Sequence, residues 1–342
     1  MSGSITERNF LGRGQFIRLS AGGGKHSRDY ALSFTEPYFL GRRIAAGFDI
    51  YRSTRRYNYT YDSETTGGTV RFGLPITQNI TTQLAYNLSK EEYTYDDHCL
   101  DANGVFNPAV CNVSQAIQDA IIDPVTGEAR GPWVRSSVSG NVIYNTIDDM
   151  KNPHYGIYAN AGIEVAGLGG DAKFIRYTAR GSVYQTLSDQ MDIVGLVSGG
   201  AGYIQSYGSN GLRVFDYFEN NDRMIRGFEY NGIGPVASGT SGDHLGGSTY
   251  LHASAEAQFP LPVVPESLGL RGAVFADAAT LYGNKVDGVD PASTGMKWRA
   301  SVGLGLLWAS PFGPLRIDYA VPVKKEATDD VQEFNFGIST RF

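Results

Sequence analysis

Residues 333–342 read EFNFGISTRF, and two sets of side chains alternate along this segment. In an extended chain, neighbouring side chains point to opposite faces. The alternation therefore predicts a strand with one largely apolar face and one polar face. The first face comprises Phe334, Phe336, Ile338, Thr340 and Phe342, and the second comprises Glu333, Asn335, Gly337, Ser339 and Arg341.

The same alternation recurs along the chain, for example in residues 298–308, 315–321 and 175–183. We find about fifteen such segments, most of about ten residues, which is the length that a tilted strand needs to cross a bilayer. The sequence has 43 glycines, 21 tyrosines and 17 phenylalanines, a composition that favours strands over helices. No run of apolar residues approaches the roughly 18 that a helical membrane span requires.

The connections between these segments alternate in length. Short turns are expected near residues 11–14, 40–42, 74–77, 187–189 and 310–313. Long loops are expected at 97–131, 205–246 and 282–295. Short turns on one side and long loops on the other are typical of an outer-membrane barrel. Counting back from Phe342, the long loops fall on the extracellular side. We therefore predict that residues 1–342 form one transmembrane antiparallel β-barrel domain.

A large soluble barrel or propeller would show similar alternation. Aromatic residues at the ends of the predicted strands favour the membrane barrel, because such residues form girdles at both interfaces. They are Tyr38, Tyr51, Tyr93, Trp298, Trp308 and Phe342.

The formal net charge of −6 does not suggest a nucleic-acid partner. The start of the chain shows no signal peptide, so we expect a processed chain or a piece of a longer one.

The loop at 97–131 holds both cysteines, Cys99 and Cys111. In an oxidising compartment their close spacing favours a local disulfide. The alternative is a metal site, which would need two more ligands, and only His98 is near. A short surface helix is also expected, because apolar residues recur with helical spacing. These residues are Val113, Ala116, Ile117, Ala120 and Ile121.

The loop at 206–246 contains DRMIRGFEY at residues 222–230, with apolar Ile225 and Phe228 around Arg226 and Gly227. Such flanks indicate that the arginine folds inward, where its guanidinium needs carboxylate partners. Glu256 and Asp277 share the lumenal face of two neighbouring predicted strands. The alternative is that these carboxylates only line a water-filled channel.

Enzyme chemistry has little support in the sequence. The five histidines are scattered, and their spacing suggests no Ser/His/Asp set. His252 and Glu256 share a lumenal face, which favours a hydrogen bond over an acid–base pair. The glycine runs precede no helix and are not phosphate loops. We expect no cofactor, no metal and no catalytic residues.

Several segments resemble BamA-type outer-membrane protein assembly factors. Ile225-Arg226-Gly227-Phe228 matches the V/I-R-G-F/Y signature of that family and its relatives. Residues 272–279 resemble its G-x-x-F-x-D-x-G strand, with Ala279 replacing the last glycine. Residues 33–39, 308–315 and 319–322 are also similar to the family, so the resemblance covers essentially the whole chain.

The resemblance implies a sixteen-stranded barrel preceded by periplasmic POTRA domains, with Arg226 docked on Glu256 and Asp277. POTRA domains are absent here, and residues 4–10 correspond to the family's second strand, so we expect about 15 strands and a partial chain. The loop at 206–246 is expected to fold into the lumen. The terminal strand, with Phe334, Phe336, Ile338 and Phe342, resembles the signal by which barrel clients are recognised.

The implied function is assembly of β-barrel proteins in the bacterial outer membrane, with client strands templated at a weak seam between the first and last strands. The implied partners are unfolded outer-membrane proteins, BAM-type lipoproteins, periplasmic chaperones and the lipid bilayer. A two-partner-type secretion pore is the main alternative, since it shares the loop motif. A plain porin, which would lack the motif, and a barrel enzyme rank below it.

Overall fold

The structure is a computed structural model that describes residues 2–24, 27–57, 60–101, 104–150, 152–208, 211–221, 223–239, 241–261, 268–310 and 313–337. It is dominated by one antiparallel sheet of 15 strands. The first strands are β1 (Ser2–Phe10), β2 (Gln15–Gly23), β3 (Ser27–Glu36), β4 (Ala45–Tyr57), β5 (Tyr61–Pro75), β6 (Ile80–Tyr95), β7 (Trp133–Asn145) and β8 (Gly156–Gly170). The remaining strands are β9 (Phe174–Ser188), β10 (Ile193–Ser206), β12 (Thr249–Pro260), β13 (Leu270–Tyr282), β14 (Arg299–Ser310), β15 (Gly313–Lys324) and β17 (Phe334–Gly337).

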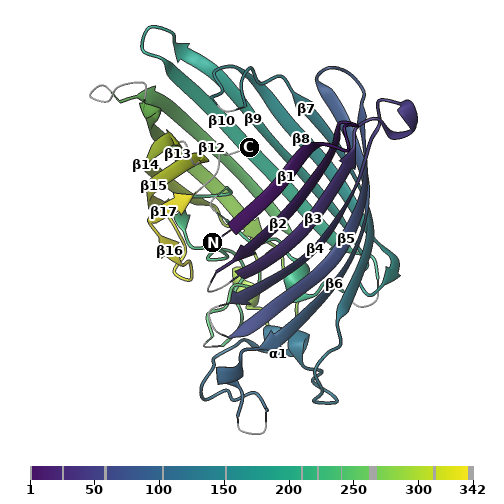
Figure 1. Cartoon of the computed structure of the whole chain (residues 1–342). Helices are drawn as coiled ribbons and strands as arrows, with labels where there is room; N and C mark the ends of the chain where they lie inside the picture. The colour runs from purple at the N-terminus through teal and green to yellow at the C-terminus, as the bar shows by residue number, and fades with distance from the viewer. Residues whose placement is uncertain are drawn as a thin grey trace.

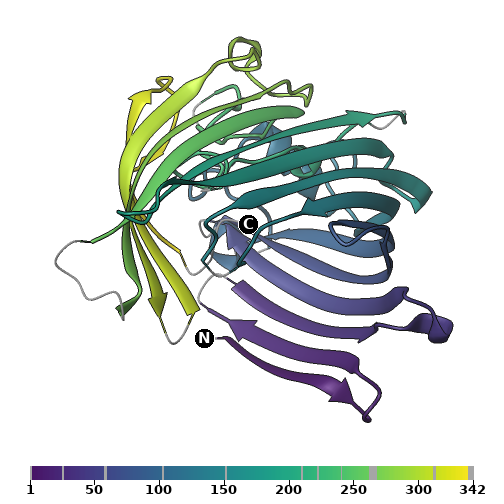
Figure 2. The ribbon, with the colours of Figure 1, turned by 90° about the horizontal axis from the view of Figure 1, so that it is seen from above.

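Every strand of the sheet pairs with its neighbours in sequence order. The ribbon in Figure 1 is therefore a continuous meander, and Figure 2 shows that it curls around a central space with β1 at one edge and the C-terminal strands at the other. Within the described residues, β1 and β17 do not pair with each other. The fifteen-strand antiparallel architecture confirms the fold class predicted from the alternation.

The two faces of the sheet differ as the alternation predicts. Apolar side chains are exposed on the outside, where Val302, Leu304 and Leu306 of β14 are examples. Charged side chains are buried on the inside. This is the reverse of a soluble protein, and it suits a sheet whose outer face meets lipid. No helix in the described part of the chain is long and apolar enough to cross a membrane.

The girdle expectation was wrong for two tyrosines. Tyr93 points inward and stacks on Phe215 with ring centroids 3.7 Å apart. Tyr51 shares a face of β4 with Asp49, whose carboxylate pairs with Arg71 of β5. An aromatic residue at a strand end can face either side, and the parity along the strand decides which. Tyr38, Trp298 and Trp308 are exposed.

The loops add small elements to the sheet. They are α1 (Gln115–Ile121), the short 3-10 turns η1 (Phe39–Gly41), η2 (Asp97–Cys99), η3 (Val214–Asp216) and η5 (Pro291–Ser293), and the two-stranded ladder of β11 (Gly227–Phe228) and β16 (Val331–Gln332). Helix α1 forms where the apolar spacing predicts it. Its buried residues Ala116, Ile117 and Ile121 pack with Val214 and Leu245 of the loop at 206–246.

The described part of the terminal strand ends at Gly337. Strand β17 pairs with β15 over four residues, from Tyr319↔Phe334 to Arg316↔Gly337. Phe334 and Phe336 are exposed. Ile338 and Phe342, the other residues of the predicted terminal signal, lie outside the described residues.

Candidate functional site

The loop at 206–246 places Arg226 against the inner wall of the sheet. Its Nε and Nη2 atoms donate to the two carboxylate oxygens of Asp277, each over 2.7 Å. Its Nη1 donates to Glu256 Oε2 over 2.8 Å. The side chains of Arg226 and Glu256 are fully shielded from solvent, and that of Asp277 is nearly so. The structure thus brings together the three charged residues singled out from the sequence.

Two further charged residues from β15 complete the cluster. Arg316 donates to both oxygens of Glu256, over 3.0 and 2.7 Å. It also donates to Asp318 through Nε, over 2.8 Å. Two guanidinium groups therefore share three carboxylates, and Glu256 accepts from both cations. A buried charge is tolerated only when it is paired and hydrogen-bonded, and this network meets that condition.

Strand register explains why these side chains meet. Ser254 on β12 lies directly opposite Asp277 on β13, so Glu256 is a diagonal neighbour of Asp277 on the same face. Strand β14 lies between β13 and β15, and its lumenal position Gly305 carries no side chain. A Cβ atom there would lie 2.6 Å from Asp318 Oδ1 and 3.1 Å from Arg316 Nη2. The glycine therefore lets β15 reach the carboxylates across β14.

Apolar groups shield the cluster. Ile225 and Phe228 are buried with Met224, Ile233, Ala279 and Leu281 in one hydrophobic cluster. The guanidinium carbon of Arg226 lies 3.2 Å from the centre of the Phe275 ring. Excluding water strengthens each charge-assisted hydrogen bond, which is the physical role of the apolar residues on both sides of Arg226.

Gly227 lets the backbone of the motif approach β15. Its φ of +90° is a conformation that residues with a side chain rarely adopt. A Cβ atom at this position would lie 3.2 Å from the carbonyl oxygen of Ala320 and 3.3 Å from its Cβ. Both the conformation and the space therefore favour glycine.

Replacing Gly227 with alanine is expected to weaken loop docking by about 1–3 kcal/mol. The cost of a positive φ and the cost of the close contact between the new Cβ and Ala320 add to each other. The thermal midpoint of barrel unfolding, followed by heat-modifiable gel mobility, measures the loss. Gly12→Ala is the matched control, because Gly12 also has a positive φ of +70° but nothing within 4 Å of the added Cβ. Equal losses in the two variants would contradict the close-approach explanation.

The motif also contacts the last loop before the terminal strand. Gly227 pairs with Gln332 and Phe228 with Val331 in the β11–β16 ladder. His244 Nε2 lies 3.0 Å from the carbonyl oxygen of Thr328, and its side chain is 2% exposed. Burial lowers the pKa of His244 below its ordinary range, partly offset by Asp330 and Asp329.

Acidification is therefore expected to loosen residues 325–333. The pKa of His244 is lower when docked than its ordinary value of about 6.5. Its stabilising contribution is complete above that value and is lost as the pH falls through the docked pKa. Hydrogen-exchange protection of this segment, corrected for intrinsic rates, should fall as the pH drops below about 6.5. A His244→Gln variant should lose that pH dependence, and an unchanged dependence would rule out His244 as its source.

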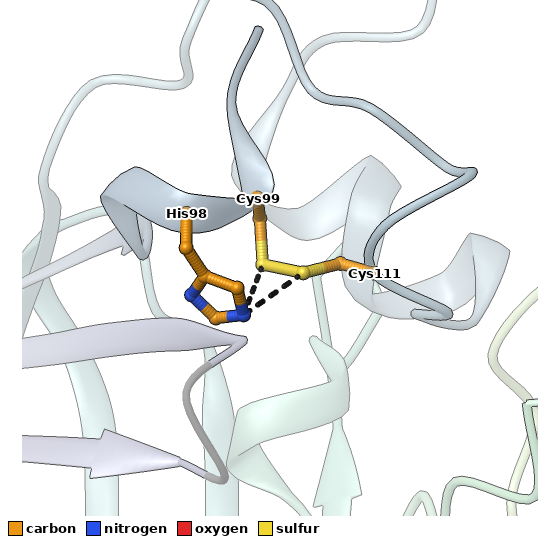
Figure 3. A group of neighbouring side chains, drawn as sticks. All are labelled: His98, Cys99 and Cys111. Carbon is orange, nitrogen blue, oxygen red and sulfur yellow. Dashed lines mark hydrogen bonds between the residues drawn. A yellow bond between two sulfur atoms is a disulfide. The ribbon is translucent and has the colours of Figure 1, made fainter.

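Cys99 and Cys111 form a disulfide in the loop between β6 and β7. Figure 3 shows His98 beside it, with Nε2 3.8 Å from Cys99 Sγ and 3.4 Å from Cys111 Sγ. These three residues are the one group in the described chain whose ligand atoms are close enough to hold a metal ion. The joined sulfurs offer no thiolates, so the oxidised pair favours the structural interpretation.

Replacing both cysteines with serine is expected to make the loop at 97–131 sensitive to proteases while the barrel remains folded. Closing a loop of this size stabilises it by about 2–3 kcal/mol. Limited proteolysis of outer membranes, with and without reductant, measures the effect. The wild-type loop should acquire the same sensitivity only after reduction, and equal resistance of the variant would contradict a stabilising role.

Sequence reasoning missed Arg316 and Asp318. A signal was available, because both residues stand on the polar face of the predicted strand at 315–321. It also favoured a hydrogen bond between His252 and Glu256 over an acid–base pair. Glu256 instead accepts from Arg226, Arg316 and the Gln258 amide, so this carboxylate serves the ion network.

This fold and cluster define a class of membrane protein: a β-barrel with a loop that is clamped inside the lumen by an arginine. The Omp85 superfamily domain matches residues 9–342, and the chain belongs to this superfamily. Bacterial relatives of this chain carry the name outer membrane protein assembly factor BamA, and this chain is an outer-membrane barrel.

The outer membrane protein assembly factor BamA of Neorickettsia risticii is 28% identical over 341 residues, covering 99% of this chain and 42% of its own length. BamA of Neisseria meningitidis is 25% identical and covers 100% of this chain and 45% of its own length. The chain thus spans less than half the length of these curated relatives.

Two solved structures share the fold. The crystal structure of BamA from Haemophilus ducreyi lacking POTRA domains 1–3 has a TM-score of 0.82 at 24% identity, covering 98% of this chain and 66% of that one. CdiB from Acinetobacter baumannii has a TM-score of 0.57 at 11% identity, covering 98% and 55%.

Proposed function

We propose that this barrel belongs to a protein that assembles and inserts outer-membrane β-barrel proteins. The observation that carries the proposal is the Ile225-Arg226-Gly227-Phe228 loop, whose arginine is clamped on Glu256 and Asp277 at the inner face of the sheet. The 28% identity to a BamA over almost the whole chain supports it. The larger TM-score with BamA than with CdiB favours assembly over a dedicated secretion pore.

The proposed mechanism is non-enzymatic. An incoming client strand pairs its backbone with an edge strand of the sheet by β-augmentation. The driving force is the satisfaction of backbone groups in the apolar core, where each unpaired group costs several kcal/mol. Within the described residues, β1 and β17 stand at the two edges of the sheet, and these are the edges at which we propose that a client strand pairs.

The height of the sheet varies around the barrel. Strands lengthen from 9 residues in β2 to 15 in β5 and 16 in β6. A shorter apolar wall near the seam would thin the bilayer locally and lower the barrier to insertion. Locking the seam of the full-length protein with an engineered disulfide should then block client assembly, and normal assembly by the locked protein would exclude seam opening.

Unfolded outer-membrane proteins are the proposed clients. BAM-type lipoproteins and periplasmic chaperones are proposed as accessory partners. The decisive test is depletion of the full-length parent protein while the levels of several unrelated barrels in the outer membrane are followed. A general fall that wild type reverses supports assembly. Loss of one secreted protein with unchanged barrels would instead identify a secretion pore.

A further inference from the structure

A second arginine, at the start of the inserted loop, also pairs with a carboxylate on the inner wall of the sheet. Arg213 Nη2 donates to Glu91 Oε2 over 2.8 Å and to Asp216 Oδ1 over 3.2 Å. Its guanidinium carbon lies 4.2 Å from the centre of the Trp133 ring. Each of the two arginines is therefore paired with at least two carboxylates and lies over at least one aromatic ring, a combination that holds a guanidinium in one orientation.

The two arginines dock on different parts of the wall. Glu91 and Trp133 belong to β6 and β7, whereas Glu256 and Asp277 belong to β12 and β13. Strands β8, β9 and β10 lie between these two docking sites in the sheet. We name residues 213–221 and 223–228 the strap.

The part of the strap between Arg213 and Arg226 also contacts the inner face of the sheet. Arg176 on β9 donates to the carbonyl oxygen of Asp216 over 2.8 Å, and its guanidinium lies 5.4 Å from the Phe218 ring. Phe218 packs edge-on against Tyr250 of β12 with centroids 4.9 Å apart. Phe218 also exchanges two backbone hydrogen bonds with Gly247, each 2.9 Å long. The strap therefore touches successive strands rather than crossing open space.

The start of the strap adjoins a cavity of about 1390 Å³ that is lined in part by Glu91, Trp133 and Arg213. This end of the strap is held by the arginine contacts together with the packing of Val214 and Phe215.

We propose that Arg213 is a second anchor of the inserted loop and a positioning residue. Together with Arg226 it ties β6 and β7 to β12, β13 and β15, and so holds the curvature of the sheet between them. On the proposed function, on which this inference rests, the strap keeps the back of the barrel rigid while strands at the seam separate to receive a client.

The test uses single cysteines in the full-length protein in outer membranes, where the native disulfide does not react with maleimide. Leu212→Cys reports on the start of the strap and Met224→Cys on its end. Arg213→Ala should raise labelling of Leu212→Cys about tenfold or more, from the loss of charge-assisted hydrogen bonds. It should leave labelling of Met224→Cys within about twofold, because Arg226 still holds that end.

Client assembly per folded barrel is the second readout. It should fall several-fold in Arg213→Ala, recover partly in Arg213→Lys, and fall no further in the Arg213→Ala/Arg226→Ala double variant than in the more affected single variant. Arg52→Ala is the control, because Arg52 forms an exposed ion pair with Glu64. It should leave both readouts at wild-type values.

Two results would overturn the inference. Unchanged labelling of Leu212→Cys in Arg213→Ala would show that Arg213 is not an anchor. A lower amount of folded barrel with an unchanged assembly rate per barrel would show a purely structural role. If depletion of the parent leaves other barrels unaffected, the proposed function fails, and the labelling experiment still decides whether Arg213 anchors the strap.

Discussion

Arg226→Ala is expected to destabilise the docked loop by about 3–5 kcal/mol. The substitution removes one cation from a buried network, and the carboxylates of Asp277 and Glu256 lose the hydrogen bonds that it donates. Asp277 would lose its guanidinium hydrogen bonds, and Glu256 and Asp318 would keep those from Arg316. The side chains of Arg226 and Glu256 are both fully buried, so solvent does not screen the resulting repulsion. We expect release of the Ile225 and Phe228 flanks and a lower thermal midpoint by heat-modifiable mobility.

Arg226→Lys separates charge from geometry. Lysine keeps the positive charge but cannot make the paired hydrogen bonds to Asp277, so an intermediate loss is expected. Arg52→Ala removes a cation whose side chain is 59% exposed, and it should leave the thermal midpoint close to that of wild type. A loss in Arg226→Ala no larger than this control would contradict the buried-network account.

Arg316→Ala is expected to be nearly as damaging as Arg226→Ala, again about 3–5 kcal/mol. Arg316 bridges Glu256 and Asp318, and its loss leaves Arg226 as the single guanidinium among three carboxylates. The same thermal assay measures the effect. Glu256→Ala should cost less, because two cations and two carboxylates remain and each arginine keeps a partner.

The Arg316→Ala/Asp318→Ala double variant tests this charge argument. Removing Asp318 together with Arg316 takes away a carboxylate that would otherwise be buried without its partner, so the double variant should be more stable than Arg316→Ala alone. A double variant that is less stable, with losses that add, would show that the two residues contribute through packing and not through their charges.

Much of the fold could be predicted because strand alternation is a local property. Residues 298–308 alternate whatever the rest of the chain does, and the resulting strand β14 spans Arg299–Ser310. Loop lengths and the apolar spacing near α1 are also readable in order along the chain. The expectation that Tyr93 belongs to a girdle was wrong, because an aromatic residue at the end of a strand can point to either face of the sheet.

The amino-acid sequence by itself determined the period-two strands, the alternation of short turns and long loops, and the motif around Arg226, and it favoured a disulfide between Cys99 and Cys111. Each depends on neighbours in the chain. Only the tertiary structure decided that Arg316 reaches Glu256 across a side-chain-free position on β14, and that Arg213 docks on Glu91 and Trp133. Those contacts join residues 60 and more than 100 positions apart, and they depend on strand register and on the path of a folded loop, which no local pattern encodes.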